Sequence, residues 1–264
     1  MPDLRDSKIS IVGASQGIGK ALALELASRG AELFLLSRDE RALAEVAAEA
    51  GRRGAKAHYA VCDATDLDRM KERAKEAAVA MGRIDIAVLN AGVAGSGFAD
   101  EFSSAKVKKI FDVNVYGLAH GLEAYIPIML AQGGGTIAGV SSLADSRGFP
   151  GSAAYSASKA AASHLLEATR VELRNRGVKV ITIKPGFVRT NMTNKNDFTM
   201  PFLMEVDRAA KIIANGLERG KPRIYFPKMM TAISTLGRII PGAIFDWALK
   251  DKKYSARKID NPPS

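Results

Sequence analysis

The 264-residue sequence has little of several features that define common protein classes. Its single cysteine, Cys62, excludes an internal disulfide framework and suits a reducing compartment. No apolar run approaches the roughly 18 residues of a membrane span. The first residues place Asp3 and Asp6 where a signal peptide needs an apolar stretch. We therefore expect a cytoplasmic protein without a transmembrane segment.

Metal-binding and nucleic-acid-binding signatures are also missing. His58, His120 and His164 are far apart and share no metal-ligand spacing, so we expect no metal site. There is no zinc-finger spacing and no RNP-type aromatic motif, although the formal net charge is +10. That charge is unevenly placed, because residues 221–264 contain nine Lys or Arg and three Asp. A basic tail on a mildly charged domain explains it, and we expect no nucleic-acid partner.

Short apolar runs alternate with longer helical patterns along a chain that is 47% hydrophobic and 25% charged. Runs such as AELFLLS and VKVITIK are largely apolar, as in parallel strands covered on both faces. The alternation predicts an α/β fold with a single Rossmann-type, doubly wound parallel sheet of about seven strands. The predicted strands are Ile9–Gly13, Glu32–Ser37, Lys56–Cys62, Ile84–Asn90, Gly135–Ser141, Val178–Lys184 and Arg223–Phe226. The predicted helices include Ile18–Ser28, Glu40–Ala50, Leu67–Ala80, Ser103–Leu130, in which Pro127 kinks or ends a turn, and Ala153–Asn175.

A glycine-rich turn follows the first predicted strand, at the edge where doubly wound sheets bind ligands. Residues 11–19 read IVGASQGIG, so Gly13, Gly17 and Gly19 stand between strand and helix. Glycines there let the backbone approach a pyrophosphate, which the helix N-terminus favours electrostatically. The spacing differs from the common G-x-G-x-x-G, and a purely structural role is the alternative. The position at the first strand–helix junction favours a dinucleotide site.

The end of the second predicted strand bears on the choice of cofactor. A site that prefers NAD usually has an acidic residue there to bind the ribose 2′-hydroxyl. This sequence has Ser37 followed by Arg38, and a guanidinium pairs bidentately with a 2′-phosphate. The alternative is that Arg38 is a solvated charge and Asp39 contacts the ribose. Asp39 is better explained as a cap or first-turn acid of the next helix, so the sequence favours NADP(H) over NAD(H).

Seven motifs occur together in one order along the chain. They are GASQGIG at 13–19, CDATD at 62–66, LNAG at 89–92, Asn114, SS at 141–142, YSASK at 155–159 and PGFVRT at 185–190. Each is a weak signal alone. As a set, with these spacings, the chain resembles the short-chain dehydrogenase/reductase family in its compact single-domain branch. The resemblance runs from about Lys8 to about Thr193, with a weaker continuation to Phe226.

The resemblance implies a catalytic tetrad of Asn114, Ser142, Tyr155 and Lys159, with Ser142 rather than Ser141 as the catalytic serine. It further implies that Asp63 contacts the adenine ring, that Asn90 and Gly92 shape the turn against the adenine ribose, and that Thr190 contacts the nicotinamide carboxamide. The expected cofactor contacts are Gly13, Ser15, Gly17, Ile18, Gly19, Ser37, Arg38, Asp63, Asn90, Gly92, Tyr155, Lys159, Pro185, Gly186, Val188 and Thr190.

Tyr155 and Lys159 stand at i and i+4, one turn apart on one helix face. A free phenol has a pKa of about 10, and a nearby ammonium favours the phenolate and lowers that pKa. A phenol tuned in this way gives a proton to a carbonyl oxygen as hydride arrives and takes it back in the reverse direction. Ser142 can hydrogen-bond the same oxygen and orient the carbonyl. The resemblance adds that Lys159 binds the nicotinamide ribose and that Asn114 helps hold a water for proton replenishment.

The C-terminal segment departs from family members that end in a short strand and a glycine-rich tail. We expect residues 1–226 to form the dinucleotide-binding catalytic domain and residues 227–264 a helical extension packed on it. Met229, Ile233, Leu236 and Ile240 follow a helical stripe, and Lys250, Lys252 and Lys253 come after Trp247. Three interpretations stay open: the stripe packs on its own domain or a dimer mate, caps the substrate cleft beside the apolar loop 187–205, or makes a weak contact with an anionic membrane surface.

The sequence therefore predicts an NADP(H)-dependent carbonyl reductase or alcohol dehydrogenase that acts on a hydrophobic or lipid-like ketone or secondary alcohol. The alternatives are a reductase of 3-oxoacyl thioesters and a cofactor-binding protein without turnover, which the intact tetrad argues against. The resemblance also implies a homodimer or homotetramer, assembled through the helices predicted at 103–130 and 153–175. The substrate itself is not readable from the sequence.

Overall fold

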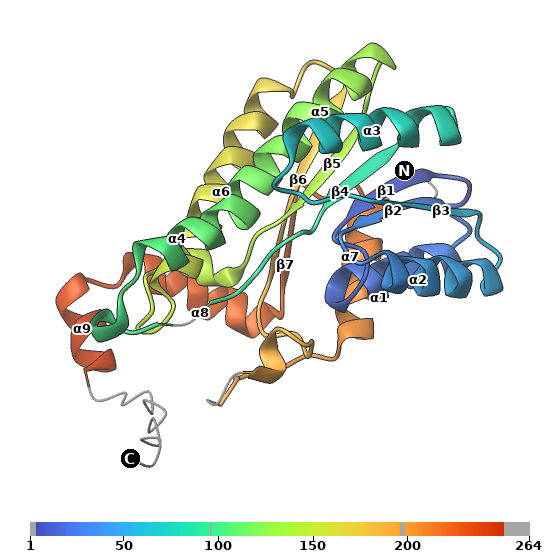
Figure 1. Cartoon of the computed structure of the whole chain (residues 1–264). Helices are drawn as coiled ribbons and strands as arrows, with labels where there is room; N and C mark the ends of the chain where they lie inside the picture. The colour runs from blue at the N-terminus through green and yellow to red at the C-terminus, as the bar shows by residue number, and fades with distance from the viewer. Residues whose placement is uncertain (1–3, 96, 196–198, 251–264) are drawn as a thin grey trace.

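The structure is a computed structural model that describes residues 4–95, 97–195 and 199–250 (Figure 1). Seven parallel strands form one sheet in the order β3-β2-β1-β4-β5-β6-β7. The strands are β1 Lys8–Val12, β2 Glu32–Ser37, β3 Ala57–Val61, β4 Ile86–Leu89, β5 Gly135–Val140, β6 Val178–Pro185 and β7 Arg223–Phe226. The predicted doubly wound sheet is confirmed, and the strand order reverses between β1 and β4, where such folds bind ligands.

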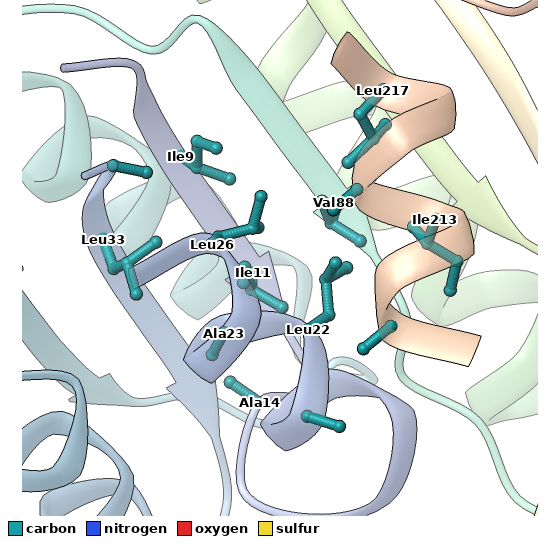
Figure 2. Close-up of a cluster of buried hydrophobic side chains, with 14 of the residues drawn as sticks. Ile9, Ile11, Ala14, Leu22, Ala23, Leu26, Leu33, Val88, Ile213 and Leu217 are labelled. Atoms are coloured by element: carbon teal, nitrogen blue, oxygen red, sulfur yellow. The ribbon is translucent and has the colours of Figure 1, made fainter. Parts of the chain in front are cut away.

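Helices cover both faces of the sheet (Figure 1). One layer contains α1 Gly17–Ser28, α2 Glu40–Arg52 and α7 Val206–Glu218; the other contains α3 Leu67–Met81, α4 Ser104–Phe111, α5 Gly117–Ala131 and α6 Ala153–Glu172. A core of buried apolar side chains lies in each layer, which explains why strands such as β2 are buried along their whole length. Figure 2 shows the first core, where α1 and α7 pack on the sheet through Ile9, Ile11, Ala14, Leu22, Leu26, Leu33, Val88, Ile213 and Leu217.

The predicted helix 103–130 is divided in the structure by a π-helical turn at Asp112–Tyr116, which separates α4 from α5. Pro127 lies inside α5, and the helix continues to Ala131, so of the two predicted alternatives, a kink or an end, the end is excluded. The buried side chains of Tyr125 and Met129 flank it on α5 and anchor the helix in the core. Tertiary packing therefore overrides the local preference of proline to stop a helix.

Two helices, α8 Lys228–Ile239 and α9 Gly242–Leu249, follow the edge strand β7. Helix α8 packs against β7 and against a short 3₁₀ helix, η3 Leu143–Ser146. Its predicted apolar stripe is more than half exposed at Met229, Ile233 and Leu236. Within the described ranges, no helix is both long and apolar enough to span a membrane.

Candidate active site

The turn between β1 and α1 is tightly packed against the loop after β4. A Cβ on Gly13, which has φ +85°, would lie 2.8 Å from the backbone nitrogen of Ala91, and one on Gly19 would lie 2.0 Å from the carbonyl oxygen of Gly13. The side-chain amide of Asn90 donates to that same oxygen at 2.9 Å. The N-cap residue of α1, Gln16, makes no side-chain capping bond. The turn therefore has the cradle and the uncapped helix N-terminus that a pyrophosphate fits.

The end of β2 lies beside this turn, because the backbone nitrogens of Gly13 and Ala14 both donate to the carbonyl of Leu36. Ser37 is buried, and its hydroxyl accepts a hydrogen bond from the backbone of Asp39 at 3.1 Å. The carboxylate of Asp39 accepts from the backbone of Ala42 at 3.0 Å and caps α2, as the sequence predicted. The carboxylate of Asp39 is therefore occupied as a cap of its own helix. The guanidinium of Arg38 is left as the polar group available at the end of β2.

Arg38 is mostly exposed, and its guanidinium lies 3.7 Å from the carboxylate of Asp63. Partial burial raises the pKa of Asp63, but hydrogen bonds from Thr65 and the charge of Arg38 outweigh it and hold that pKa below its ordinary value. Arg38 and Asp63, two predicted cofactor contacts that follow different strands, therefore lie close to each other. Cys62 is buried beside them, and burial raises the pKa of its thiol to about 11, so it is not a reactive thiolate.

Asn114 lies in the π-helical turn and is almost fully buried. Its amide oxygen accepts from the backbone of Val93 at 2.8 Å, and its nitrogen donates to the Val93 carbonyl at 2.9 Å and to the Ser158 hydroxyl at 3.0 Å. The asparagine therefore joins the loop after β4 to α6, which also carries Tyr155 and Lys159. A Cβ on Gly92 would lie 3.3 Å from the Asn114 oxygen and 3.4 Å from the Lys159 nitrogen, so these three predicted residues meet.

Lys159 is 4% exposed, and its ammonium donates to the carbonyl of Val140 at 3.1 Å. Burial lowers the pKa of Lys159 to about 8. The ammonium lies 5.9 Å from the centroid of the Tyr155 ring, on the same face of α6. Ser142 lies within hydrogen-bonding reach of the Tyr155 phenol, where it acts to lower the pKa of that group.

The expected direction of the Tyr155 pKa is wrong for this structure. Burial raises the pKa of the Tyr155 phenol, and the hydrogen bond with Ser142 only partly offsets it. The reason is that a phenolate loses more solvation in this site than one hydroxyl returns. Tyr155 is therefore set up to hold its proton, which suits a proton donor.

Ser142 begins the 3₁₀ helix η3, which sequence patterns did not predict. Its hydroxyl accepts from the backbone of Ala144 at 3.1 Å and donates to the carbonyl of Pro185 at 3.5 Å. The neighbouring Ser141 points away from Tyr155: its hydroxyl donates to the carbonyl of Lys159 at 2.8 Å. The choice of Ser142 over Ser141 as the serine beside the tyrosine agrees with this geometry.

The loop after β6 closes the site on its other side. Thr190 lies against the glycine turn, with its methyl group 3.4 Å from where a Cβ on Gly17 would be. Val188 is buried and bridges to Met204, which fixes the loop on the domain. Gly186 faces Met230 of α8, whose sulfur would be 2.8 Å from a Cβ there. The structure thus brings the predicted residues of this loop to the glycine turn and to the C-terminal helices.

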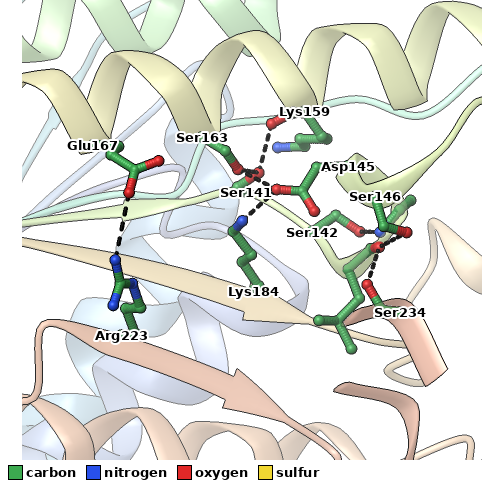
Figure 3. A network of polar contacts seen from close by, with 12 residues as sticks. Ser141, Ser142, Asp145, Ser146, Lys159, Ser163, Glu167, Lys184, Arg223 and Ser234 are labelled. Carbon is green, nitrogen blue, oxygen red and sulfur yellow. Dashed lines mark hydrogen bonds and ion pairs between the residues drawn. The ribbon is translucent and has the colours of Figure 1, made fainter. Parts of the chain in front are cut away.

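Sequence reasoning missed a polar cluster behind Ser142, formed by Asp145, Ser163 and Lys184 (Figure 3). The side chains of Asp145 and Lys184 are nearly buried and form an ion pair. The available signal was Lys184 itself, a charged residue in the apolar run VITIKP. Its partner could not be found from the sequence, because Asp145 lies in another loop. In the described part of the chain, no three His, Cys, Asp or Glu side chains are grouped as metal ligands would be.

The chain is similar to known proteins over the segments that form this site. Residues 7–200 match the model of a family described as short chain dehydrogenase. An uncharacterized oxidoreductase of Myxococcus xanthus (strain DK1622) is 39% identical over 240 residues, which cover 91% of this chain and 95% of the relative. A putative oxidoreductase, SadH, of Mycobacterium tuberculosis (strain CDC 1551 / Oshkosh) is 31% identical over 252 residues, covering 89% and 91%.

Solved structures extend the similarity to the fold. A short chain dehydrogenase/reductase from Burkholderia phymatum in complex with NAD superposes with a TM-score of 0.82 at 26% identity and covers all of both chains. Levodione reductase superposes with a TM-score of 0.79 at 24% identity, over 88% of this chain and 98% of that one. The second likeness is one of fold alone.

Proposed function

This chain belongs to the short-chain dehydrogenase family of oxidoreductases, and on that premise we propose that it is an NADP(H)-dependent carbonyl reductase or alcohol dehydrogenase. The reaction would move a hydride between the nicotinamide and a ketone or secondary alcohol. The observation that supports it best is the convergence of Ser142, Tyr155 and Lys159 beside the glycine turn. A cofactor-binding protein without turnover would not need a protonated phenol paired with a serine at this place.

The proposed mechanism assigns one task to each side chain. A bound nicotinamide would supply or accept the hydride. Ser142 and Tyr155 hydrogen-bond the carbonyl oxygen, and Tyr155 donates its proton to that oxygen as negative charge develops. Lys159, whose pKa near 8 leaves it charged at neutral pH, stabilises the phenolate that remains. Asn114 holds the loop after β4 and α6 at a fixed spacing, which keeps Lys159 in place.

Tyr155→Phe tests this assignment, because it removes the phenolic proton donor and little else. We expect kcat to fall by about 10²–10⁴-fold, the usual worth of general acid catalysis. Binding of NADPH, followed by fluorescence titration, should stay close to that of the wild type, since the glycine turn is unchanged. Near-normal turnover by this variant would refute the role of Tyr155.

The preference for NADP(H) is supported by Arg38, an exposed guanidinium at the end of β2, and by Asp39 being engaged as a helix cap. The Burkholderia phymatum relative was solved with NAD, so the choice needs a direct test. We expect wild type to use NADPH with the higher kcat/KM. Ser37→Asp combined with Arg38→Ala should reverse that order, because it repels a 2′-phosphate and supplies an acceptor for a 2′-hydroxyl. Equal use of both cofactors by the wild type would contradict the role of Arg38.

A hydrophobic or lipid-like substrate is supported by apolar side chains around the loop that precedes Tyr155. The rings of Phe149 and Phe245 of α9 meet edge-on, with their centroids 6.0 Å apart. Met230 of α8 lies against Gly186. These contacts support a role for α8 and α9, the extension that follows the catalytic domain, as a cap over the substrate. A screen with steroids, long-chain ketones, small ketones and 3-oxoacyl thioesters should give the highest kcat/KM with the large apolar ketones. A preference for the thioesters would favour the alternative, a 3-oxoacyl thioester reductase.

We also propose a cytoplasmic homodimer or homotetramer. Tyr116, Leu165 and Val171 are exposed on the helical stretch 104–131 and on α6, and their apolar surface suits a subunit interface. Sedimentation equilibrium would measure the assembly, and Val171→Asp should weaken it if α6 takes part.

Trp247 of α9 is 67% exposed near Lys250, which supports a weak contact with anionic lipid. Co-sedimentation with phosphatidylglycerol vesicles, compared with phosphatidylcholine vesicles, tests that contact.

A further inference from the structure

One buried carboxylate next to the catalytic serine has two cationic partners. The side chain of Asp145 is 1% exposed, and one of its oxygens pairs with the ammonium of Lys184 and accepts the hydroxyl of Ser163 at 2.5 Å. Its other oxygen accepts from the guanidinium of Arg238, on α8, at 3.0 Å. The C-terminal helix thus reaches a buried charge in the catalytic domain.

Asp145 joins the two backbone segments that flank Ser142. It belongs to η3, whose amides at Ala144 and Asp145 donate to the hydroxyl and the carbonyl of Ser142 at 3.1 and 3.2 Å. Lys184 immediately precedes Pro185, whose carbonyl accepts from the Ser142 hydroxyl. The ion pair therefore holds η3 against the end of β6, and the serine hydroxyl lies between them (Figure 3).

The cluster also reaches the catalytic lysine. The hydroxyls of Ser163 and Ser141 are 2.8 Å apart, and Ser141 donates to the carbonyl of Lys159. One carboxylate thus lies behind both Ser142 and the backbone of Lys159. Such a shared support fixes the orientation of groups that must hold a carbonyl in a narrow geometry.

The two cations have different roles. Lys184 is nearly buried, so it and Asp145 need each other for charge compensation. The side chain of Arg238 is 50% exposed and does not need the carboxylate for its own solvation. Its contribution is to attach α8 to η3, together with Ser234, whose hydroxyl donates to the carbonyl of Leu143 at 3.1 Å.

We propose that Asp145 is a positioning residue for Ser142, and that Arg238 couples the docking of α8 to the geometry of the catalytic serine. The inference rests on the proposed function for its kinetic consequence, but its structural part does not. When α8 is docked, Arg238 fixes the outer oxygen of Asp145 and η3 holds Ser142 at Tyr155. When the guanidinium is absent, the Asp145–Lys184 pair remains, and η3 loses its ion pair with α8, while Arg147 after η3 still donates to the carbonyl of Ile240 at the end of α8.

The test compares Arg238→Met with Arg238→Lys. Lys228→Met is the control for loss of an exposed charge at the start of the same helix. Amide hydrogen exchange at Ala144 and Asp145 reports directly on the bonds to Ser142. We expect both amides to exchange faster in Arg238→Met, to return toward wild type in Arg238→Lys and to be unchanged in Lys228→Met. With a ketone that the wild type reduces, kcat of Arg238→Met should fall about tenfold, because small displacements of catalytic groups are costly. Its KM and its affinity for NADPH should change little.

Asp145→Asn leaves Lys184 buried without a counter-charge and risks misfolding, so it is paired with the double variant Asp145→Asn, Lys184→Met. The double variant should fold and show a kcat at least as low as that of Arg238→Met, because it also removes the ion pair between η3 and β6, and adding Arg238→Met to it should lower kcat no further. Unchanged amide exchange and unchanged kcat in Arg238→Met would overturn the inference. A raised KM with normal kcat and exchange would overturn it in favour of a simple substrate cap. A wild type with no turnover on any carbonyl would refute the proposed function, and the exchange experiment would still decide the inference.

Discussion

Gly19→Ala adds a single methyl group at the most crowded point of the glycine turn. The new Cβ would lie 2.0 Å from the carbonyl oxygen of Gly13 and 2.6 Å from the side-chain nitrogen of Asn90. Carbon–oxygen contacts below 3 Å do not occur, so the turn would have to open by about an ångström. The obstacle is backbone, and it is held in place by the Asn90–Gly13 hydrogen bond, so no flexible side chain can move aside.

The expected magnitude follows from these contacts. Overpacking of a well-packed site costs about 1–3 kcal/mol, and loss of the Asn90–Gly13 bond adds about 1 kcal/mol. A loss of about 2–4 kcal/mol lowers Tm by roughly 5–15 °C in a chain of this size. The uncapped N-terminus of α1 would move with the turn, and a loss of about 1.4 kcal/mol in cofactor binding raises Kd about tenfold.

Gly51→Ala is the matched control, because Gly51 is an exposed position in α2 with no atom within 4 Å of the added Cβ. An alanine there should stabilise the helix by up to about 1 kcal/mol and leave the cofactor affinity unchanged. Calorimetry would give the two Tm values, and titration with NADPH and NADH the two affinities. If Gly19→Ala binds both cofactors as tightly as Gly51→Ala does, the turn is not the pyrophosphate site.

Two further predictions concern pH. The ammonium of Lys159, with a pKa near 8, loses its charge as the pH rises through that value. The kcat/KM of carbonyl reduction should therefore fall above about pH 8. A pH profile that stays flat to about pH 10 would contradict the role of Lys159. Burial opposes ionisation of Glu32, but hydrogen bonds from Lys8, Lys56 and His58 outweigh it and lower its pKa from 4.5 to about 2. The resulting stabilisation, about 3 kcal/mol, is present above pH 4.5 and is lost as the pH falls toward 2. Urea unfolding at about pH 7 and pH 3 should show this dependence in wild type and much less of it in Glu32→Gln.

The features that sequence predicted well are those fixed by local pattern. The apolar runs located all seven strands, most directly those covered on both faces, such as β2 and β4, which are buried along their whole length. The role of Asp39 as a cap followed from its place directly before a helix. The π-helical turn at Asn114 was not predictable, because it inserts one residue into an otherwise regular helical pattern and is set by the contacts of Asn114 with Val93 and Ser158.

The features that sequence missed depend on which segments the fold brings together. The pKa of Tyr155 was expected from its neighbour on the helix, yet burial by the surrounding loops decides its direction. The sequence left the partner of the apolar stripe of α8 open, and in the structure the stripe is exposed while Ser234 bonds to the catalytic domain. A helical pattern shows that one face is apolar, but it does not show that this face is the one that packs on the chain itself.

The contacts of the C-terminal helices α8 and α9 are the ones that matter most for function among those that the sequence pattern does not show. Sequence motifs placed all four predicted catalytic residues before residue 160, and the apolar stripe of α8 suggested a substrate cap only as one of three interpretations. The structure shows that α8 reaches the loop of Ser142 through Ser234 and Arg238, two polar residues that lie one turn apart on the same face of the helix. A charged residue that interrupts an apolar helix, or an apolar strand as Lys184 does, marks a position where a buried partner is worth seeking. In this chain both such residues lead to the same carboxylate, Asp145, and through it to Ser142.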